Sequence, residues 1–253
     1  MAMNVFGELL APQYLGWLWH GFGVTIGLSL CVCVAATLGG FALCVARLQG
    51  RGVVQWAARV YLSVFRNTPL LVQLFFWYFG ASAFLPEGFL PWLNTPRQIE
   101  VAGLALRWPS FEFIAGFFGL TLFTAAFIAE EFRAGVQGVG AGQRAAAAAL
   151  GLTPLQAWRH VILPQALHNA FSPLVGQYMN AVKNSSLTMA IGLAELSYAS
   201  RQVETQTFKT FQAFGIATLL YLLLIAVMEA ASQLWQRRGR FRRAGREAVK
   251  AAA

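Results

Sequence analysis

The sequence of 253 residues contains no aspartate, and only 11% of its residues are charged. Soluble globular domains carry a charge on about a quarter of their residues. The apolar fraction is correspondingly high, at 57%. This composition excludes an ordinary soluble domain and predicts an integral membrane protein.

Motifs for catalysis and metal binding are missing as well. The sequence has no H-E-x-x-H zinc motif, no G-x-S-x-G nucleophile elbow and no G-x-x-x-x-G-K-[ST] phosphate-binding loop. None of its three histidines has the spacing of a metal ligand. Cys31, Cys33 and Cys44 fit neither a zinc site nor a CxxC redox pair, and we interpret them as small packing residues. We therefore expect no catalytic centre, metal or cofactor on this chain.

Apolar runs that could cross a membrane recur along the sequence. A transmembrane helix needs about 20 mostly apolar residues. Five stretches are candidates, at residues 19–46, 69–84, 113–129, 167–193 and 213–234. The N-terminus lacks the features of a cleavable signal peptide, so the first span is expected to act as the insertion signal. These runs predict an all-α, polytopic membrane protein with five transmembrane helices.

Basic residues are distributed unevenly about these spans. Lys and Arg accumulate on the cytoplasmic side because they resist translocation. With the N-terminus outside, fourteen of the nineteen basic residues lie inside, seven of them in a basic tail at about residues 235–253. We therefore predict a periplasmic N-terminus and a cytoplasmic C-terminus, and we interpret the net charge of +9 as membrane orientation, without nucleic acid as a partner. Residues 87–107 then form an outer loop, long enough for short interfacial helices.

A polar segment at residues 141–166 interrupts the apolar runs and has the composition of two short helices. Gln143, Arg144 and the alanines before Leu150 favour the first helix. Gly151 can end that helix in the left-handed conformation that other residues avoid. A sharp turn is therefore predicted at this glycine.

The second helix of the segment has start signals of its own. Thr153 can cap it, and Pro154 suits the first helical position, where a missing amide costs nothing. Pro164 is predicted to end the run, and Leu152 is predicted to offer an exposed apolar side chain at the elbow. Composition alone leaves three interpretations open: a DNA reader, a surface hairpin, or the arm by which a membrane protein binds a soluble partner.

Lys183 lies inside an apolar run and is the most suggestive polar residue. A charge at membrane depth is costly, so it usually faces a polar cavity or a partner. Asn184, Ser185 and Ser186 follow it with hydrogen-bonding groups. Against a functional role, Lys183 could extend toward an interface and the serines could bond back to their own helix. A serine–lysine enzyme would need Ser186 beside Lys183, but no orienting group or oxyanion donor is evident.

Two other polar groups stand at the ends of apolar runs. Arg66 and Asn67 precede Pro69, an arrangement typical of a helix start. The plain interpretation is that Arg66 anchors the membrane surface. Glu130 and Arg133 are three residues apart and can form an ion pair on one helical face, which favours a structural role over a substrate contact.

The segment GQRAAAAALGLTPLQAWRHVILPQA resembles the signature loop by which permeases of ATP-binding-cassette (ABC) importers dock on their ATPase. One departure is that Ala145 stands where the family usually has Glu, so any contact of that carboxylate is absent or supplied elsewhere. The resemblance implies an ATPase-docking loop at about residues 130–166. Its matching residues are Gly142, Gln143, Ala146, Ala147, Gly151, Leu152, Thr153, Pro154, Arg159 and Pro164.

Three more motifs extend the resemblance over nearly the whole chain. FRNTPLLVQLFFWYFG resembles the second-span signature of polar amino acid permeases, with Ser63 where family members often carry Glu. AFIAEEFRAGVQGV at the inner end of the third span and VKNSSL in the fourth continue the match. The family often shows the last motif whatever amino acid it carries, so a general translocation or folding role competes evenly with substrate binding there.

This resemblance implies a single permease domain at residues 1–253 with the type I ABC importer fold, in a bacterial inner membrane. The chain would form the path for a polar amino acid, most closely as in glutamate/aspartate importers, by alternating access. Its partners would be a related permease or a second copy, two ATPase subunits that bind the ATP, and a periplasmic amino acid binding protein. The candidate path residues are Arg66, Asn67, Lys183, Asn184, Ser185 and Ser186.

Two other classes compete with a transport subunit. A membrane-embedded enzyme would need catalytic groups that converge within the bilayer, whereas transport needs an arm that binds a cytoplasmic partner. A structural or signalling membrane subunit would need neither. The missing phosphate-binding loop agrees with transport, because ATP chemistry would then lie on another chain.

Overall fold

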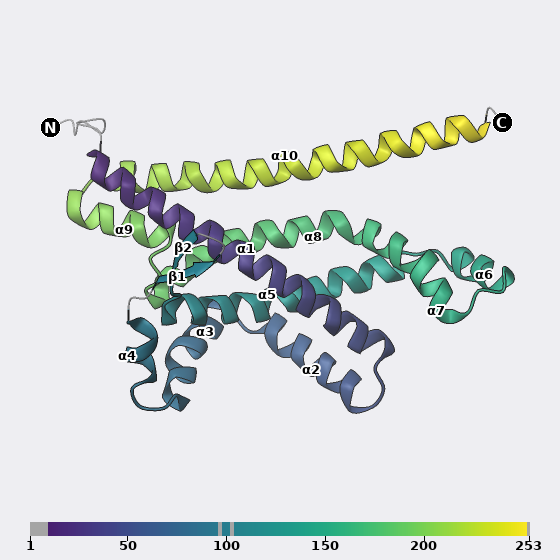
Figure 1. The fold of residues 1–253 in the computed structure, drawn as a ribbon, viewed down its shortest axis with the longest axis horizontal. Coiled ribbons are helices and arrows are strands. Elements are labelled where there is room, and N and C mark those ends of the chain that lie inside the picture. Colours follow the sequence, from purple (N-terminus) through teal and green to yellow (C-terminus); the bar gives the residue numbers. More distant parts are fainter. Residues whose placement is uncertain (1–9, 96–97, 102–103, 252–253) are drawn as a thin grey trace.

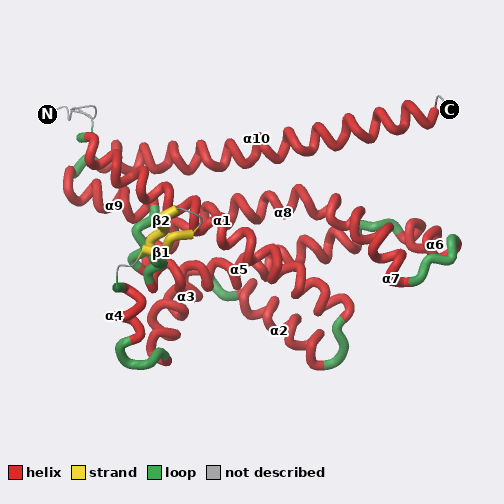
Figure 2. Tube along the Cα trace, viewed as in Figure 1, coloured by secondary structure: helices red, strands yellow, loops and turns green. Residues whose placement is uncertain are grey.

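The computed structural model describes residues 10–95, 98–101 and 104–251, and these are almost entirely helical (Figure 2). The helices are α1 (Pro12–Gln49), α2 (Val53–Asn67), α3 (Leu70–Phe75), α4 (Phe89–Asn94), α5 (Phe111–Gln137), α6 (Ala141–Ala149), α7 (Pro154–Ala157), α8 (Leu163–Ser185), α9 (Leu196–Thr207) and α10 (Thr210–Ala251). Tighter or wider turns are η1 (Phe76–Gly80), η2 (Ala81–Phe84), η3 (Trp158–Ile162) and η4 (Ser186–Ile191). The all-α prediction is confirmed.

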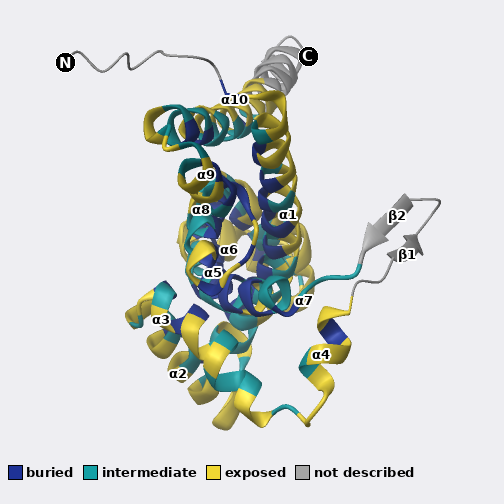
Figure 3. Cartoon of the chain, turned by 90° about the vertical axis from the view of Figure 1, so that its left-hand side faces the viewer, coloured by how far each residue is buried: buried dark blue, intermediate teal, exposed yellow. Residues whose placement is uncertain are grey.

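The core lies where α1, α5 and α8 pack together (Figure 3). Leu28, Val32 and Leu120 are fully buried there, and each buried side chain of this size contributes about 1.5–3 kcal/mol. Gly40 of α1 lets the helices approach closely, because a Cβ at that position would stand 2.5 Å from Cγ2 of Ile128 on α5. The three helices therefore form a tight scaffold for the rest of the chain.

The chain runs back and forth along the long axis of the molecule, so that α1 begins and α10 finishes at opposite ends (Figure 1). α6 and α7 lie at the same end as the C-terminus, as does the turn between α1 and α2. The elbow segment and the predicted cytoplasmic tail thus share one end. Which side of a membrane that end faces stays a prediction.

Three helices among the described residues are long and apolar enough to span a membrane, within Pro12–Gln49, Phe111–Gln137 and Thr210–Arg237. The stretch Leu70–Phe84 is apolar but shorter. The fourth predicted span corresponds to α8 and η4, which are helical but more polar. The five-span count therefore stays a prediction.

Two segments differ from the sequence-based picture in detail. The predicted second span follows Pro69 as expected, but its helix changes from α3 into a π turn and then a 3₁₀ turn. The outer loop contains the expected short helix, α4, and also an antiparallel hairpin of β1 (Gln98–Val101) and β2 (Leu104–Arg107), with Gln98 opposite Arg107. The hairpin was not predicted. Residues 96–97 and 102–103 of this loop lie outside the described residues.

Candidate functional site

The elbow at residues 150–153 is built by backbone hydrogen bonds that close the end of α6. Gly151 has a φ of +72°, in the left-handed region that favours glycine. Its N–H donates to the carbonyl of Ala148, and the N–H of Leu152 donates to that of Ala147. This pair of bonds is the Schellman arrangement, which satisfies the last carbonyls of a helix. The predicted stop at Gly151 is confirmed.

The start of α7 fixes the other side of the elbow. The Thr153 hydroxyl accepts from the N–H of Gln156 at 3.3 Å, and the Gln156 side chain accepts from the N–H of Thr153 at 2.9 Å. Pro154 occupies the first turn, as predicted. A reciprocal capping box of this kind holds the chain entering the helix in one conformation.

Pro164 does not end the helix, contrary to the prediction. Helix α7 continues through the π turn η3 into α8, and Pro164 stands in the first turn of α8. In the π turn the N–H of Leu163 donates to the carbonyl of Trp158, one residue further back than in an α-helix. This local rewinding makes room for a proline that lacks a donor. The elbow is thus joined to α8 without a break.

Leu152 is not the exposed side chain that the sequence suggested, because it is half-buried at the elbow. Its neighbours Leu150 and Leu155 are exposed instead, at 79% and 75%. Apolar side chains this exposed on a polar hairpin are typical of a contact surface. We refer to Leu150 and Leu155 as the elbow leucines.

The remaining residues of the docking motif divide into an inner and an outer set. Ala147 is buried, whereas Gly142, Gln143, Ala146 and Arg159 are exposed. Gln143 accepts a hydrogen bond from Gln165 at 3.3 Å, which links α6 to α8. The motif therefore presents its polar residues outward.

The hairpin is anchored to the body through a small apolar cluster. Val136, Val139 and Ala166 are buried together and pack against Trp158 and Ile162. These residues come from the end of α5 and the turn after it, from the π turn and from α8, so a displacement of α7 would be transmitted to both long helices.

The other predicted site residues fall into two separate groups, and the first lies in an arginine-lined cavity. Arg66 and Asn67 line a hollow of about 410 Å³ between the end of α1, helix α2 and helix α5. Glu130 accepts from Nε of Arg133 at 2.7 Å, as predicted. It also forms ion pairs with Arg47 and with Arg66, the latter at 3.7 Å. Arg47 was not among the predicted site residues, because its approach to Glu130 depends on tertiary packing.

The second group lies at the end of α8, outside this cavity. Lys183 is exposed and has no ion pair among the described residues. The Ser185 hydroxyl donates to the carbonyl of Val182 and the Ser186 hydroxyl to that of Lys183, each at 2.7 Å. Both hydroxyls therefore bond back to their own helix. This leaves Ser186 unsuited to act as a nucleophile beside Lys183.

A comparison with protein families shows which class of membrane protein this chain is. Residues 36–240 match the family described as the binding-protein-dependent transport system inner membrane component. The chain belongs to this family. It is a permease subunit of an amino acid ABC importer, a multi-pass membrane protein without its own ATPase site.

Two curated relatives cover most of this permease. It is 34% identical over 227 residues to the glutamate/aspartate import permease protein GltJ of Escherichia coli K12, which covers 90% of this chain and 89% of the relative. It is 36% identical over 204 residues to the probable glutamine ABC transporter permease protein GlnM of Bacillus subtilis 168. The match covers 81% of this chain and 84% of GlnM.

Solved structures agree with the fold. The permease matches a crystal structure of an amino acid ABC transporter with histidines at a TM-score of 0.76 and 27% identity, over 91% of this chain and all of the other. It also matches an inward-facing structure of the MetNI methionine ABC transporter at a TM-score of 0.67 and 18% identity. This match covers 90% of this chain and 99% of the other. The second likeness supports the fold alone.

The permease also contains a buried carboxylate that sequence analysis missed. Glu195, fully buried, caps α9 by accepting from the N–H of Tyr198 at 2.9 Å. It also accepts from the hydroxyls of Tyr221 on α10, at 2.7 Å, and Thr25 on α1, at 3.3 Å. The only local signal was a glutamate directly after an apolar run, in N-cap position. Its neutral donors tie three helices together.

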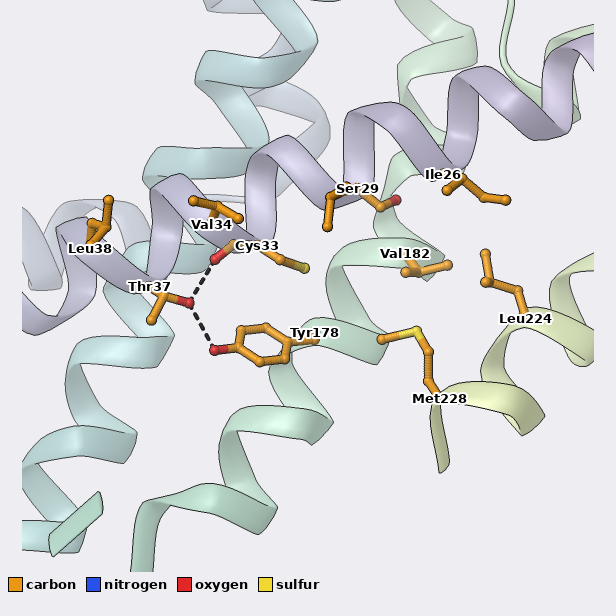
Figure 4. A pocket seen from close by; sticks show the side chains of 11 residues that line it. Ile26, Ser29, Cys33, Val34, Thr37, Leu38, Tyr178, Val182, Leu224 and Met228 are labelled. Atoms are coloured by element: carbon orange, nitrogen blue, oxygen red, sulfur yellow. Dashed lines mark hydrogen bonds between the residues drawn. The ribbon is translucent and has the colours of Figure 1, made fainter. Parts of the chain in front are cut away.

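An apolar groove of about 590 Å³ separates α10 from α1 and α8 (Figure 4). Leu224 and Met228 of α10 face Tyr178 of α8 across it, and the hydroxyls of Tyr178 and Thr37 are 2.8 Å apart. The groove is otherwise lined almost entirely by apolar side chains. It lacks the charged groups that an amino acid would need, so we do not include it in the site.

Proposed function

We propose that this permease forms the membrane path of an ATP-driven importer for a polar amino acid, with glutamate or aspartate as the cargo. The observation that supports this most directly is the elbow, a rigid hairpin with two exposed leucines that continues unbroken into α8. The cargo assignment draws on the relative GltJ, described as a glutamate/aspartate import permease. Because GlnM is described as a probable glutamine permease, the cargo needs a direct test.

A permease of an ABC importer works with a partner permease and ATPase subunits. We propose that this chain pairs with a related permease or a second copy, binds two ATPase subunits that hold the ATP, and receives cargo from a periplasmic binding protein. Alternating access would then be driven through the elbow. Ala145 is exposed on α6, so a contact that a glutamate would make there falls to other residues of the hairpin.

The proposed coupling runs from the ATPase through α7 into α8. The elbow leucines flank the turn on both sides, so one apolar pocket on the ATPase could bury both. A pull on α7 reaches α8 through the π turn, and α8 carries Lys183 at its far end. We propose Lys183, Asn184, Ser185 and Ser186 for the path itself, and Arg66 and Asn67 for its cytoplasmic mouth.

The docking role is tested by charging the elbow leucines. A buried leucine contributes about 1.5–3 kcal/mol, so Leu150→Asp with Leu155→Asp should reduce ATPase copurification by about tenfold or more. Leu150→Met with Leu155→Met keeps apolar side chains of similar size and should retain binding. Membrane insertion should be normal in both variants. Equal ATPase recovery and equal transport-coupled hydrolysis in all three proteins would reject the docking role.

Half-buried Leu152 distinguishes docking from hairpin stability. Leu152→Asp should also weaken ATPase association, but through damage to the elbow. Its membrane body should remain intact, because the hairpin lies beyond the core of α1, α5 and α8. Protease sensitivity of the hairpin in the permease alone should rise with Leu152→Asp and stay unchanged with the two elbow leucines charged.

Cargo and path are tested with the complete importer in liposomes. Uptake of labelled glutamate, aspartate, glutamine and a basic amino acid would rank the cargo. Lys183→Met should lower uptake, because it removes the charge proposed to act in the path. It should leave assembly intact, because the side chain keeps a similar length. Unchanged uptake would remove Lys183 from the proposed path, and loss of assembly alone would make its role structural.

A further inference from the structure

The arginine-lined cavity carries more positive charge than its single carboxylate can balance. Its lining includes four arginines, Arg47, Arg59, Arg66 and Arg133, and one acid, Glu130. Glu130 has ion pairs with three of these arginines, and Arg59 has none among the described residues. The formal charge of the lining is therefore +3 when every group is ionised.

Neutral side chains leave room beside these guanidinium groups. Ser63 and Asn67 are exposed on the same face of α2 as Arg59 and Arg66, and they line the hollow. The guanidinium of Arg66 lies 5.5 Å from the centre of the Phe127 ring, which holds it over the cavity wall. About 410 Å³ of space thus adjoins several donors that point in from three helices.

We propose that this cavity binds a phosphate group. Guanidinium groups bind phosphate oxygens through paired, charge-assisted hydrogen bonds, and arginines converging from several directions suit a tetrahedral anion. The surplus charge favours an anion over a zwitterion. Since Glu130 is already held by Arg47, Arg66 and Arg133, the added ligand would bind chiefly at Arg59 and the free sides of the others.

The position of the cavity allows two sources for this phosphate. Arg47 is in the last turn of α1, a helix long enough to span a membrane, so the cavity lies at the level of lipid headgroups. Val60 and Val64 are exposed on α2 beside its polar face and could contact an acyl chain. The same end of the protein would also be open to free phosphate in the cytoplasm under the predicted orientation.

The test places a carboxylate in the cavity by mutation. In Ser63→Glu, the new side chain would lie four residues after Arg59 and three before Arg66, spacings that favour ion pairs on a helix. It should lower phosphate affinity about tenfold, the effect of losing one charge-assisted bond. Arg59→Gln should do the same. Ser63→Gln has nearly the same size without charge, so it should bind phosphate more tightly than Ser63→Glu. Arg51→Gln removes an exposed arginine outside the lining and should bind like wild type.

Binding is measured on the full permease, with thermal melting of each variant as a check on folding. In one experiment, inorganic phosphate is titrated into the permease in lipid-free detergent, and its binding is followed by phosphorus NMR. In the other, the permease is taken from nanodiscs of phosphatidylglycerol or phosphatidylcholine, and the lipid that it retains is counted by native mass spectrometry. Phosphate binding in detergent identifies the free anion. Retention of phosphatidylglycerol alone identifies the headgroup.

Three results would overturn the proposal. The first is that the wild-type protein binds neither probe, and the second is that Ser63→Glu and Ser63→Gln bind equally well. The third is that glutamate displaces bound phosphate at a lower concentration than competing phosphate does. The last result would make the cavity a cargo contact, which supports the proposed function while rejecting a phosphate site. If the cavity binds phosphate normally but the importer takes up no amino acid, the phosphate site stands and the transport assignment fails.

Discussion

Two glutamates hold helices together in this permease by opposite means. Glu195 is fully buried and accepts from Thr25, Tyr221 and a backbone N–H, all neutral donors. Glu130 is partly exposed and is surrounded by arginines. The first arrangement joins α1, α9 and α10, and the second joins α1, α2 and α5.

The difference shows how the partners of a carboxylate decide what else a site can do. Neutral donors fill the hydrogen-bonding positions of Glu195 in a closed, buried place, so the described residues leave no positive charge and no open space there to bind an anion. Arginines around Glu130 satisfy it and leave positive charge in an open cavity. Burial also penalises the ionised form at Glu195, whereas Glu130 has guanidinium groups beside it that offset its charge. The first is therefore a structural joint and the second a site that can accept an anion.

Removing the buried carboxylate should have the largest effect. Glu195→Ala leaves the hydroxyl of Tyr221 and the N–H of Tyr198 without their acceptor in a buried place, and we expect a loss of about 2–4 kcal/mol in stability. Thermal unfolding in detergent measures it. The matched control is Glu204→Ala on the same helix. Its ion pair with the exposed Arg201 is long, at 3.8 Å, and should contribute under about 0.5 kcal/mol. Equal melting of the two variants would contradict the joint.

Removing the partly exposed carboxylate, Glu130, should reduce stability less, and the loss should depend on salt. Glu130→Ala leaves several arginines close together, and we expect a loss of about 1–2 kcal/mol at low ionic strength. Salt screens their repulsion, so the deficit should shrink between low salt and roughly 0.5 M salt. The loss of stability in Glu195→Ala should not change with salt, because no charged partner among the described residues surrounds that position. Melting curves of both variants over a salt series separate the two cases. Parallel responses to salt would show that the two carboxylates do not differ in this way.

The smallest effect expected is a change in pH dependence. Burial, the larger influence, outweighs the hydrogen bonds and raises the pKa of Glu195 above its ordinary value of 4.5. The folded protein then holds this proton to higher pH than the unfolded chain. Stability from this group is fully present below the unfolded pKa and falls as pH rises through the folded value. Glu195→Gln cannot titrate, so its melting temperature should decline less from about pH 4.5 upward. An unchanged slope would indicate that Glu195 does not titrate in this range.

What the sequence could predict was decided by how local the interactions are. Gly151, Thr153 and Pro154 act on their own turn, and each took the conformation expected of it. Pro164 is local too, but its outcome depended on a π turn that sequence patterns do not reveal. Leu152 failed as an exposed contact because its burial depends on how the hairpin folds back.

Contacts between distant segments were beyond sequence reasoning. Thr25 and Glu195 are 170 residues apart, so no spacing rule joins them. Arg66 was chosen for its place before Pro69, yet its cavity also needs Arg47 from α1 and Glu130 from α5. The resemblance to a family suggested what spacing could not, namely the proposed docking role of the elbow. It supplied nothing about the buried joint or the surplus charge.

The length of α10 places the basic tail at graded heights above the membrane. Its 42 residues extend about 63 Å, roughly twice the hydrocarbon thickness of a bilayer. A helix that leaves the bilayer near Glu229 brings the backbone of Arg237 about 12 Å beyond the hydrocarbon, among the headgroups, and that of Lys250 about 20 Å further. Charge interactions decay over about 8 Å at physiological salt. Under the predicted orientation, only the first turn of the tail would then lie within reach of lipid charge.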